Sequence, residues 1–276
     1  MTPAPPGGPE GLSPSLAAAW AALRDRLANL DSLLVAFSGG VDSGLLLAAA
    51  ARVLGPRVTA ALCTGPFTPP WEAARARGMA RELGVELLEL DAGELAQPAL
   101  AANLADRCYL CKRRRLELLV EEAQRRGIAA VAEGSQADDR AADRPGSRAV
   151  AELGVLSPLR EAGLDKARVR ALSQALDLPT AAAPAAACLA TRIPTGTPLT
   201  AEALARVARA EAAAREVLGE VRLRVRDHFP LARLELDPEL LALAVSPALR
   251  DRLKEGLVAA GYRWACLDLA GYHSGG

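Results

Sequence analysis

The sequence is poor in aromatic residues, has no excess of either charge and contains no long hydrophobic run. Aromatic residues make up 3% of the 276, and 33 Lys and Arg residues balance 33 Asp and Glu residues. A neutral chain has no overall field that would attract nucleic acid or an anionic membrane. No apolar run approaches the about 20 residues that a membrane helix needs. These absences predict a protein with neither nucleic acid nor a membrane as its partner.

Lysine is also scarce, cysteines occur in an odd number, and no export signal is recognisable. Only three residues are lysine, and five are cysteine in a chain too long to need disulfide staples. Such cysteine usage indicates a reducing compartment. Residues 1–15 are rich in Pro and Gly and lack the charged and then apolar pattern of a signal peptide. We therefore expect a cytoplasmic protein with a disordered N-terminal tail over residues 1–15.

Short apolar runs alternate with helical periodicity through the first two thirds of the chain. After a helix at 16–29, strands are expected at 32–37, 57–63, 85–90 and 128–132, and helices at 44–54, 70–83 and 107–126. This alternation predicts an α/β fold, in which a parallel sheet carries helices on both faces. Ligands of such sheets bind at the carboxyl ends of the strands.

From about residue 200 the pattern changes to that of a small α+β unit. A helix is expected at 201–217, strands at 221–226, 231–236 and 262–269, and a helical stretch at 238–259. A Pro-rich segment precedes this unit and is typical of a linker. We predict a nucleotide-binding domain over 16–180, a linker carrying Cys188 over 181–200, and a C-terminal α+β domain over 201–276.

The segment Ser38-Gly39-Gly40-Val41-Asp42-Ser43 connects a buried strand to a helix. Its two glycines let the backbone approach an anion closely, and the amides at the start of the helix point towards phosphates. Ser38 and Ser43 add hydroxyl donors. Asp42 would repel phosphate unless a divalent cation lay between them, so we assign Mg2+ to Asp42. The loop contains no lysine, which argues against the γ-phosphate chemistry of ordinary P-loops.

This loop resembles the PP-loop of the ATP pyrophosphatase superfamily. The resemblance implies an adenine-nucleotide alpha hydrolase-like fold, bound ATP and Mg2+, and cleavage between the α- and β-phosphates to give an adenylylated substrate. A later segment, Glu133–Asp139, resembles the second acidic turn of the superfamily. The nucleotide contacts implied in this way are Ala36, Ser38, Gly39, Gly40, Asp42, Ser43, Gly134 and Asp138.

Two cysteines, Cys108 and Cys111, stand three residues apart at the start of a predicted helix. This spacing places both thiols on one side of the helix, and a helix N-terminus favours the thiolate form. The pair alone is compatible with a redox site, half of a metal site or two packed small residues. Cys63 and Cys266 lie in strand-like runs and are expected in the core.

Seven segments, in order and from about residue 16 onwards, resemble the LarE family. They are RCYLCK, EGSQADDRAADRPG, ELGVLSPL, ACLATRIPTGTPLT, LRVRDH, LARLEL and LDLAGYHSGG. LarE proteins are ATP-dependent sulfur transferases that help to make the nickel-pincer nucleotide cofactor of lactate racemase. The resemblance implies that the carboxylates of pyridinium-3,5-biscarboxylic acid mononucleotide are adenylylated and converted to thiocarboxylates. It also implies a closed homo-oligomer, a trimer or a hexamer.

The resemblance implies two possible sulfur donors. Cys188 matches the catalytic cysteine whose own sulfur is sacrificed in some members of the family. Members with three active-site cysteines instead bind a 4Fe-4S cluster, and three thiolates leave one iron free. Cys108, Cys111 and Cys188 supply that number, so we hypothesise the cluster-bearing type, with sacrifice of Cys188 as the alternative.

A nucleotide substrate needs a cationic site for its own phosphate. Arg224 and Arg226 stand two apart on a predicted strand, so they project to the same face and can grip one phosphate. Glu235 is a candidate to orient one of these arginines. The resemblance adds three further substrate-binding residues, Lys112, Thr191 and Arg192.

Three other functions stay open at this point. A tRNA thiolase of the same superfamily would add an RNA-binding module and a basic surface. An ammonia-using amidotransferase-type synthetase would not need Cys188. A nucleotide sensor without turnover would keep the loop but release no pyrophosphate.

Overall fold

The computed structural model describes residues 9, 11–139, 146–183 and 187–273. Most of the predicted N-terminal tail lies outside these residues, and the first helix begins at Pro14, within it. Contacts divide the chain into two compact units, each made of three segments. The first unit contains Met1–Gly65, Pro70–Ala92 and Asp106–Ala186, and the second contains Pro66–Pro69, Gly93–Ala105 and Ala187–Gly276. The predicted domain boundaries stay a prediction.

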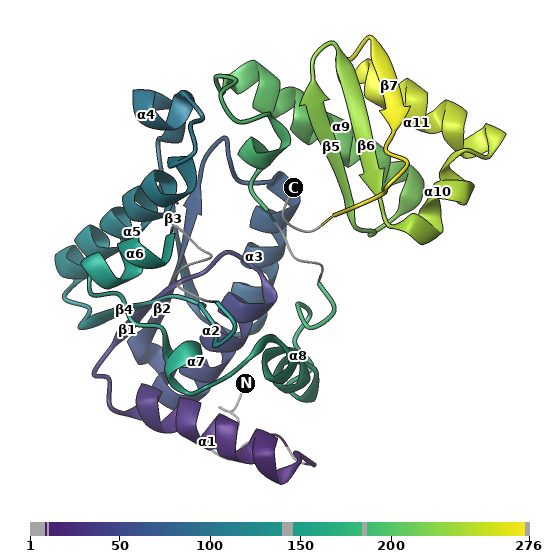
Figure 1. Ribbon diagram of the computed structural model, residues 1–276. Helices are drawn as coiled ribbons and strands as arrows, with labels where there is room; N and C mark the ends of the chain where they lie inside the picture. The colour runs from purple at the N-terminus through teal and green to yellow at the C-terminus, as the bar shows by residue number, and fades with distance from the viewer. Residues whose placement is uncertain (1–8, 10, 140–145, 184–186, 274–276) are drawn as a thin grey trace. The chain divides into compact units, whose positions relative to one another are not determined.

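The first unit is built on a four-stranded parallel sheet with strand order β3-β2-β1-β4 (Figure 1). Its strands are β1 (Leu33–Ala36), β2 (Val58–Thr64), β3 (Glu86–Asp91) and β4 (Ala130–Ala132). Its helices are α1 (Pro14–Ala28), α2 (Val41–Leu54), η1 (Gly55–Arg57), α3 (Pro70–Glu82), α5 (Arg107–Arg126), α6 (Gly146–Glu152), α7 (Pro158–Glu161) and α8 (Lys166–Ala175). The predicted strands and long helices of this region are confirmed.

Helices cover both faces of this sheet because its central strand β1 is apolar on both sides. Leu33 and Val35 of β1 join a cluster with α1, α2, α3 and α8, whereas Leu34 joins a cluster with α5 and α6 on the other side. Figure 1 shows α5 and α6 on one side of the strands and α2 and α3 on the other. A sheet buried on both faces is the expected setting for parallel strands. The predicted α/β class is therefore confirmed.

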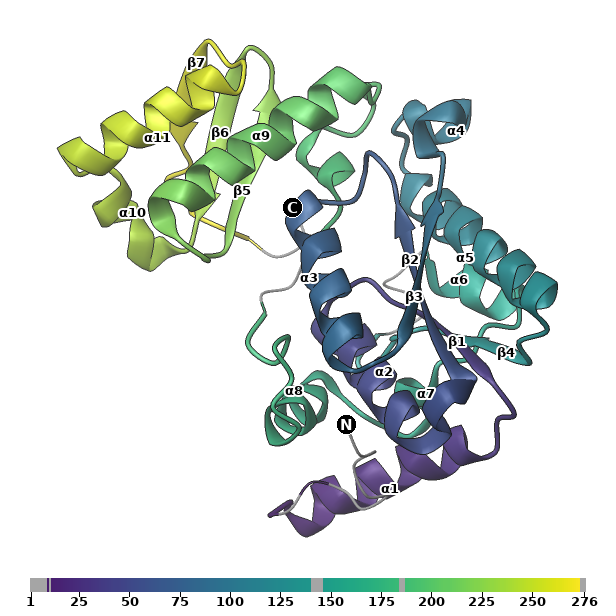
Figure 2. The same cartoon turned by 180° about the vertical axis from the view of Figure 1, so that it is seen from behind.

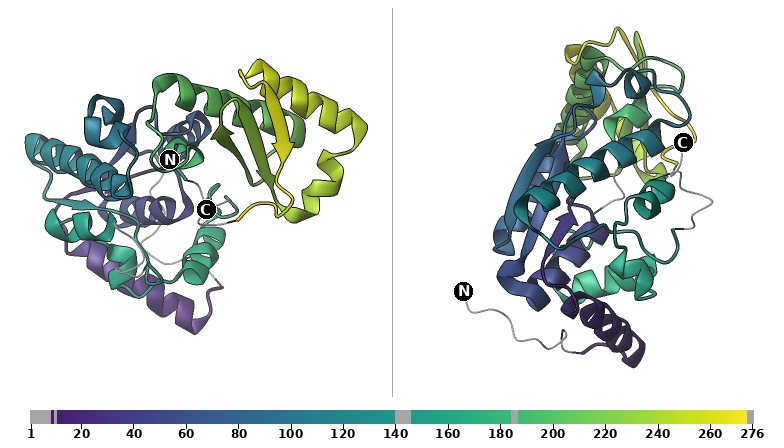
Figure 3. Two further views of the ribbon diagram at one scale, coloured as in Figure 1. Left: turned by 45° about the horizontal axis from the view of Figure 1, so that its top comes forward. Right: turned by 90° about the vertical axis from the view of Figure 1, so that its left-hand side faces the viewer.

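The second unit contains a three-stranded sheet with order β5-β6-β7. β5 and β6 are antiparallel, and β6 and β7 are parallel. Helices α9 and α11 pack on one face of this sheet, as the views in Figures 2 and 3 show. The elements are η2 (Glu94–Ala96), α4 (Pro98–Ala101), η3 (Leu189–Arg192), α9 (Ala201–Leu218), β5 (Leu223–His228), β6 (Leu231–Leu236), α10 (Pro238–Ala244), α11 (Pro247–Ala259) and β7 (Trp264–Leu267).

Two expectations for the second unit differ from the structure. The single helical stretch expected over 238–259 is divided into α10 and α11, because Pro247 lacks the amide proton that a continuing helix needs and begins a new one. Cys266, expected in the core, is exposed on β7, whereas Cys63 is buried as expected. Cys266 pairs with Arg233, on the face of the sheet opposite the one that α9 and α11 cover. Within the described residues no helix is long and apolar enough to span a membrane.

Candidate active site

The predicted phosphate loop follows β1 and ends in the first turn of α2. Gly39 has φ +75°, and a Cβ added there would lie 3.0 Å from the backbone nitrogen of Ala76, so glycine is required for both conformation and space. Gly40 is the N-cap of α2, and its carbonyl accepts a hydrogen bond from the Gly44 amide at 2.8 Å. The loop therefore presents the amide end of a 14-residue helix to a ligand.

Two serine hydroxyls close this loop. The backbone amide of Ser38 donates to Ser43 Oγ at 3.3 Å, and the two hydroxyl oxygens are 3.1 Å apart. Ser43 is buried. The contact fixes the width of the loop and places both predicted hydroxyl donors side by side.

The Asp42 carboxylate is held by a lysine that sequence reasoning missed. Lys166 Nζ, at the start of α8, donates to both Asp42 oxygens at 2.8 and 2.6 Å. The backbone amide of Lys166 donates to Asp138 Oδ2 at 2.9 Å. Lys166 thus connects the phosphate loop to the second acidic turn. Both Asp42 oxygens contact a cation in this structure, and carboxylate oxygens are also the ligands that Mg2+ prefers.

The second acidic turn is anchored by a buried carboxylate, Glu133. Its oxygens accept from Lys112 Nζ at 2.8 Å, from the hydroxyls of Ser135 and Ser157, and from the Ser135 amide. Burial alone would raise the pKa of Glu133, but the charge of Lys112 and these hydrogen bonds lower it below its ordinary value. Glu133 is therefore ionised and fixes the Lys112 ammonium at this edge of the sheet.

Gly134 brings the second acidic turn against the phosphate loop. A Cβ at this position would lie 2.8 Å from the backbone nitrogen of Ser43 and 3.1 Å from the carbonyl carbon of Asp42. The two loops follow β1 and β4, which are neighbours in the sheet. The first unit thus brings the predicted nucleotide residues together: Ala36, Ser38, Gly39, Gly40, Asp42, Ser43, Gly134 and Asp138.

The paired cysteines lie in the first turn and a half of α5. Cys108 is exposed and Cys111 is half-buried, while Tyr109 between them packs into the core. Arg107 Nη2 donates to Cys108 Sγ at 3.6 Å. In the part of the chain that the structure describes, no three Cys, His, Asp or Glu side chains form a metal-binding group.

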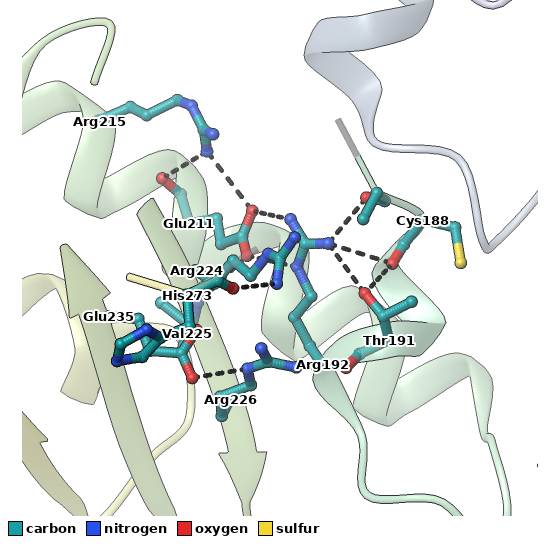
Figure 4. Close-up of polar contacts among 11 residues, drawn as sticks. Cys188, Thr191, Arg192, Glu211, Arg215, Arg224, Val225, Arg226, Glu235 and His273 are labelled. Atoms are coloured by element: carbon teal, nitrogen blue, oxygen red, sulfur yellow. Dashed lines mark hydrogen bonds and ion pairs between the residues drawn. The ribbon is translucent and has the colours of Figure 1, made fainter. Parts of the chain in front are cut away.

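Cys188 belongs to the second unit and is the N-cap of η3. Its carbonyl oxygen accepts from Thr191 Oγ1 at 2.8 Å and from Arg192 Nη1 at 3.2 Å. In Figure 4 the sulfur atom points away from these hydrogen bonds. The backbone of the cysteine is therefore fixed, while its half-buried thiol takes no part in holding it.

Arg192 is a buried cation held by a carboxylate that sequence reasoning also missed. Glu211 of α9 accepts from Arg192 Nε at 2.8 Å and from Nη2 at 3.2 Å, and it also accepts from the Val225 amide at 3.1 Å (Figure 4). Arg192 Nη1 donates to the Ala187 carbonyl at 2.7 Å. Arg192 therefore ties the cysteine segment to α9 and, through Glu211, to the edge strand β5.

Arg224 and Arg226 lie on the same face of β5 and are both buried. Arg226 Nε donates to Glu235 Oε1 at 2.8 Å, and its Nη1 donates to the Thr191 carbonyl at 2.8 Å. Arg224 lies over the Tyr272 ring and donates to the His273 carbonyl at 3.2 Å. Burial, with help from neighbouring arginines, lowers the pKa of Arg224. A buried cation of this kind favours an anionic ligand.

The second unit brings the other predicted residues together, and their roles in substrate binding stay predictions. They are Cys188, Thr191, Arg192, Arg224, Arg226 and Glu235. Lys166 had one signal in the sequence, because lysine is rare in this chain and an arginine would be the ordinary choice. Glu211 had none, since it lies within a regular amphipathic helix.

A parallel sheet whose first strand leads through this loop into a helix defines a PP-loop nucleotide-binding domain. In agreement, the asparagine synthase family model matches residues 20–142. An uncharacterized protein of Synechocystis sp. is 38% identical over 92% of this chain and 94% of its own length. The pyridinium-3,5-bisthiocarboxylic acid mononucleotide synthase of Lactiplantibacillus plantarum is 36% identical over 95% of this chain and 94% of its own length. An uncharacterized protein of Methanocaldococcus jannaschii is 26% identical over 91% of this chain.

The chain belongs to the LarE family of ATP-dependent sulfur transferases. The predicted family, fold class and type of enzyme are thereby confirmed. The PP-loop domain is one that uses ATP and Mg2+.

Proposed function

We propose that this enzyme adenylylates the carboxylates of pyridinium-3,5-biscarboxylic acid mononucleotide and converts them to thiocarboxylates for the nickel-pincer nucleotide cofactor. The name of the Lactiplantibacillus plantarum relative, which describes the bisthiocarboxylic acid product, supports this substrate. The observation that carries the proposal is the combination of a PP-loop with Cys188 fixed next to Thr191, Arg192 and the arginines of β5.

In the first step a substrate carboxylate oxygen attacks the α-phosphorus of ATP. The new oxygen–phosphorus bond replaces the bond to the β-phosphate, and pyrophosphate leaves with its electron pair. The amides at Gly40 and the start of α2 stabilise the developing charge on pyrophosphate. Asp42 is the residue that would hold Mg2+, which would neutralise phosphate charge when bound. The product of this step is an acyl adenylate.

In the second step a sulfur nucleophile attacks the acyl carbon, and AMP leaves. In the sacrificial route the nucleophile is Cys188, which becomes a thioester. Loss of the proton on its Cα and cleavage of its Cβ–sulfur bond leave dehydroalanine on the chain and a thiocarboxylate on the substrate. The hydrogen bonds to the Cys188 carbonyl keep its backbone in place through this change.

We favour the cluster-bearing type of enzyme, in which Cys108, Cys111 and Cys188 hold a 4Fe-4S cluster. Cys108 and Cys111 fit half of such a site, because both lie on the first turns of α5 and one of them is exposed. Cys188 is a free, half-buried thiol of the second unit. When bound, the cluster supplies sulfide on an iron that no cysteine occupies. Cys188 then serves as a ligand and stays intact.

The substrate's own phosphate has a place at the buried arginines of β5. Among the described residues Arg224 makes one hydrogen bond to a backbone carbonyl and one ring contact, so its guanidinium has donors left for an anion. Arg226 is oriented by Glu235. Thr191 and Arg192 are further candidates for binding the substrate's phosphate, and Lys112 is a candidate for binding the substrate, as the family resemblance implies. We further infer a cytoplasmic homo-oligomer, a trimer or a hexamer, as the family resemblance implies.

Analysis of iron and of protein mass, before and after reaction with ATP and substrate, tests this function. Protein purified without oxygen is expected to contain iron and to keep its full mass after turnover. Absence of iron, with loss of the mass of hydrogen sulfide from Cys188, would establish the sacrificial route instead. The Cys188→Ser variant is expected to release pyrophosphate but to form no thiocarboxylate.

Three further measurements distinguish this function from the other three that the sequence left open. An active Cys188→Ser enzyme would favour an ammonia-using synthetase. Salt-dependent binding of tRNA would favour a tRNA thiolase. Failure to release pyrophosphate with any carboxylate nucleotide would indicate a sensor without turnover.

A further inference from the structure

The Lys166 ammonium forms an ion pair with Asp42, the carboxylate that holds Mg2+ in the proposed reaction. Its ammonium contacts both oxygens of Asp42, at 2.8 and 2.6 Å, so a metal ion at Asp42 requires this ammonium to move. The Lys166 side chain is 36% exposed and that of Asp42 is 30% exposed, so the pair lies at the surface of the loop and can exchange.

The backbone of Lys166 is held in place, whereas its ammonium lies at the end of a flexible side chain. Its backbone amide donates to Asp138 at 2.9 Å, and α8 begins here with Asp165 as its N-cap. Val169 and Leu172 of α8 are fully buried in the cluster that includes α2. The lysine stem is flexible, and its compact ammonium can leave one oxygen for another without a fixed geometry. Any new partner must therefore lie near the phosphate loop.

The type of residue supports a role in exchange. Three of the 33 basic residues are lysine, and arginine supplies every other cation. An arginine at this position would grip Asp42 with a planar fork, which holds a carboxylate through two parallel hydrogen bonds. A lysine makes a point contact that a divalent ion can displace. A lysine can therefore pair with Asp42 in one state and leave this carboxylate free for a metal ion in another.

We propose that Lys166 holds Asp42 in the metal-free enzyme, yields Asp42 to magnesium when MgATP binds, and then pairs its ammonium with the β- and γ-phosphates. Mg2+ and the Lys166 ammonium both carry positive charge, so they repel each other and compete for the two Asp42 oxygens that the ammonium now contacts. The polyphosphate brings the nearest new anions, since it lies at the amides of the same loop. Lys166 thereby places a second cation on the pyrophosphate that leaves. This inference rests on the ATP-dependent activation step of the proposed function and on no later step.

The Lys166→Gln variant separates the nucleotide-free state from the nucleotide-bound state. The proposed exchange predicts that the substitution raises the affinity for free Mg2+ and lowers the affinity for the magnesium nucleotide. Without nucleotide, Mg2+ is expected to bind about tenfold more tightly than to the wild type, since a competing cation is gone. With an ATP analogue that cannot be cleaved between its α- and β-phosphates, the magnesium complex is expected to bind about tenfold more weakly. Both affinities are measured by isothermal titration calorimetry on the full chain.

The Lys166→Arg variant tests the need for release. It keeps the charge but holds Asp42 through a fork, so it is expected to bind free Mg2+ no better than the wild type and the magnesium nucleotide more weakly. Lys254→Gln carries the same substitution as the first variant on α11 of the second unit and is expected to change neither affinity. Thermal unfolding of every variant verifies that the chain is folded.

Each outcome decides the inference. If Lys166→Gln binds the magnesium nucleotide as tightly as the wild type or more tightly, Lys166 only competes with the metal and the proposal is wrong. If its affinity for free Mg2+ is unchanged, Asp42 does not exchange partners and the proposal is also wrong. Failure of the wild-type enzyme itself to bind the magnesium nucleotide would instead overturn the activation step, which distinguishes the two failures.

Discussion

Glu211 is a carboxylate with no exposed surface that accepts hydrogen bonds from three residues of the second unit, Arg192, Arg215 and Val225. Glu211→Gln removes the charge that compensates buried Arg192 and is expected to lower the free energy of unfolding by about 3 kcal/mol. Urea denaturation measures this loss. Glu202→Gln lies on the same helix, but its carboxylate is 86% exposed and 3.7 Å from Arg206. It is expected to change stability by less than about 0.5 kcal/mol, and an equal loss in both variants would contradict the role of Glu211.

Glu133 makes stability depend on pH in the acid range. Its pKa is lowered in the fold, so its contribution is complete above the ordinary value of 4.5 and is lost as the pH falls through the lowered value. Lys112→Met removes the nearest charge and is expected to cost about 2 kcal/mol at pH 7, with a smaller difference from the wild type at pH 3. Urea denaturation at the two pH values tests this.

The neighbouring Arg113→Met is the control for Lys112→Met. Arg113 is about half exposed and pairs with Glu117 one turn along the same helix. Its substitution is expected to change stability by less than about 0.5 kcal/mol at either pH. A pH-independent loss in Lys112→Met would show that packing, and not charge, is what Lys112 contributes.

Individual residues were predictable where their signal is local. Asp42 and Ser43 stand inside one short motif, and Arg226 follows from the two-residue period of a strand. The rarity of lysine marks Lys166 in the sequence, but its contact with Asp42 was not predictable, because the two residues are 124 positions apart. Glu211 joins Arg192 across 19 residues and two different elements. Such contacts depend on packing, which no motif records.

At the scale of elements, the loop that follows β4 lies close to the start of α2, and this leaves no space for a side chain at Gly134. Gly134→Ala would place a methyl group 2.8 Å from the Ser43 nitrogen and force the phosphate loop to move. We expect a loss of about 2 kcal/mol in stability and weaker binding of ATP, measured by thermal unfolding and calorimetry.

Gly78 on α3 is the matched control, because a Cβ there meets nothing within 4 Å. Gly78→Ala is expected to raise stability by about 0.5–1 kcal/mol, since alanine restricts the unfolded chain and suits a helix. The two identical substitutions should therefore act in opposite directions. Destabilisation by both would contradict the assignment of the Gly134 effect to the loop.

Several elements were predictable because their periodicity extends over several turns or a buried strand, although the ten-residue helix α8 was not expected. The helices at 70–83 and 107–126 were expected within a residue of α3 and α5. The four-residue helices α4 and α7 were not, because a single turn has no period to recognise. The break before Pro247 was visible in the sequence, yet its apolar residues continue the helical pattern on both sides.

At the scale of the whole molecule, the second unit draws on segments far apart in the chain. Within that unit the amides of Leu189, Gly196 and Leu199 donate to carbonyls of residues 67, 103 and 101. Asn103 Nδ2 adds bonds to the carbonyls of Pro194 and Thr197, both at 2.9 Å. The 187–199 segment is therefore held by residues that precede it by about a hundred positions.

A fragment of residues 187–276 tests this organisation. Without residues 66–69 and 93–105, the amides of Leu189, Gly196 and Leu199 are expected to exchange with deuterium at least about tenfold faster than in the full chain. Amides of β5 and β6 should stay protected, since α9 and α11 remain. Hydrogen exchange followed by NMR measures both, and equal protection throughout would show that the C-terminal segment is sufficient.

The hydrogen bonds around Cys188 have a consequence for a chain that has given up its sulfur. Thr191 and Arg192 hold the carbonyl of that residue, and neither contact involves the thiol. If sulfur comes from the cysteine itself, a used chain keeps the same fold and the same phosphate loop. Spent enzyme would sequester ATP and substrate, because it still binds both, and a cell would have to remove it by proteolysis or outnumber it by synthesis.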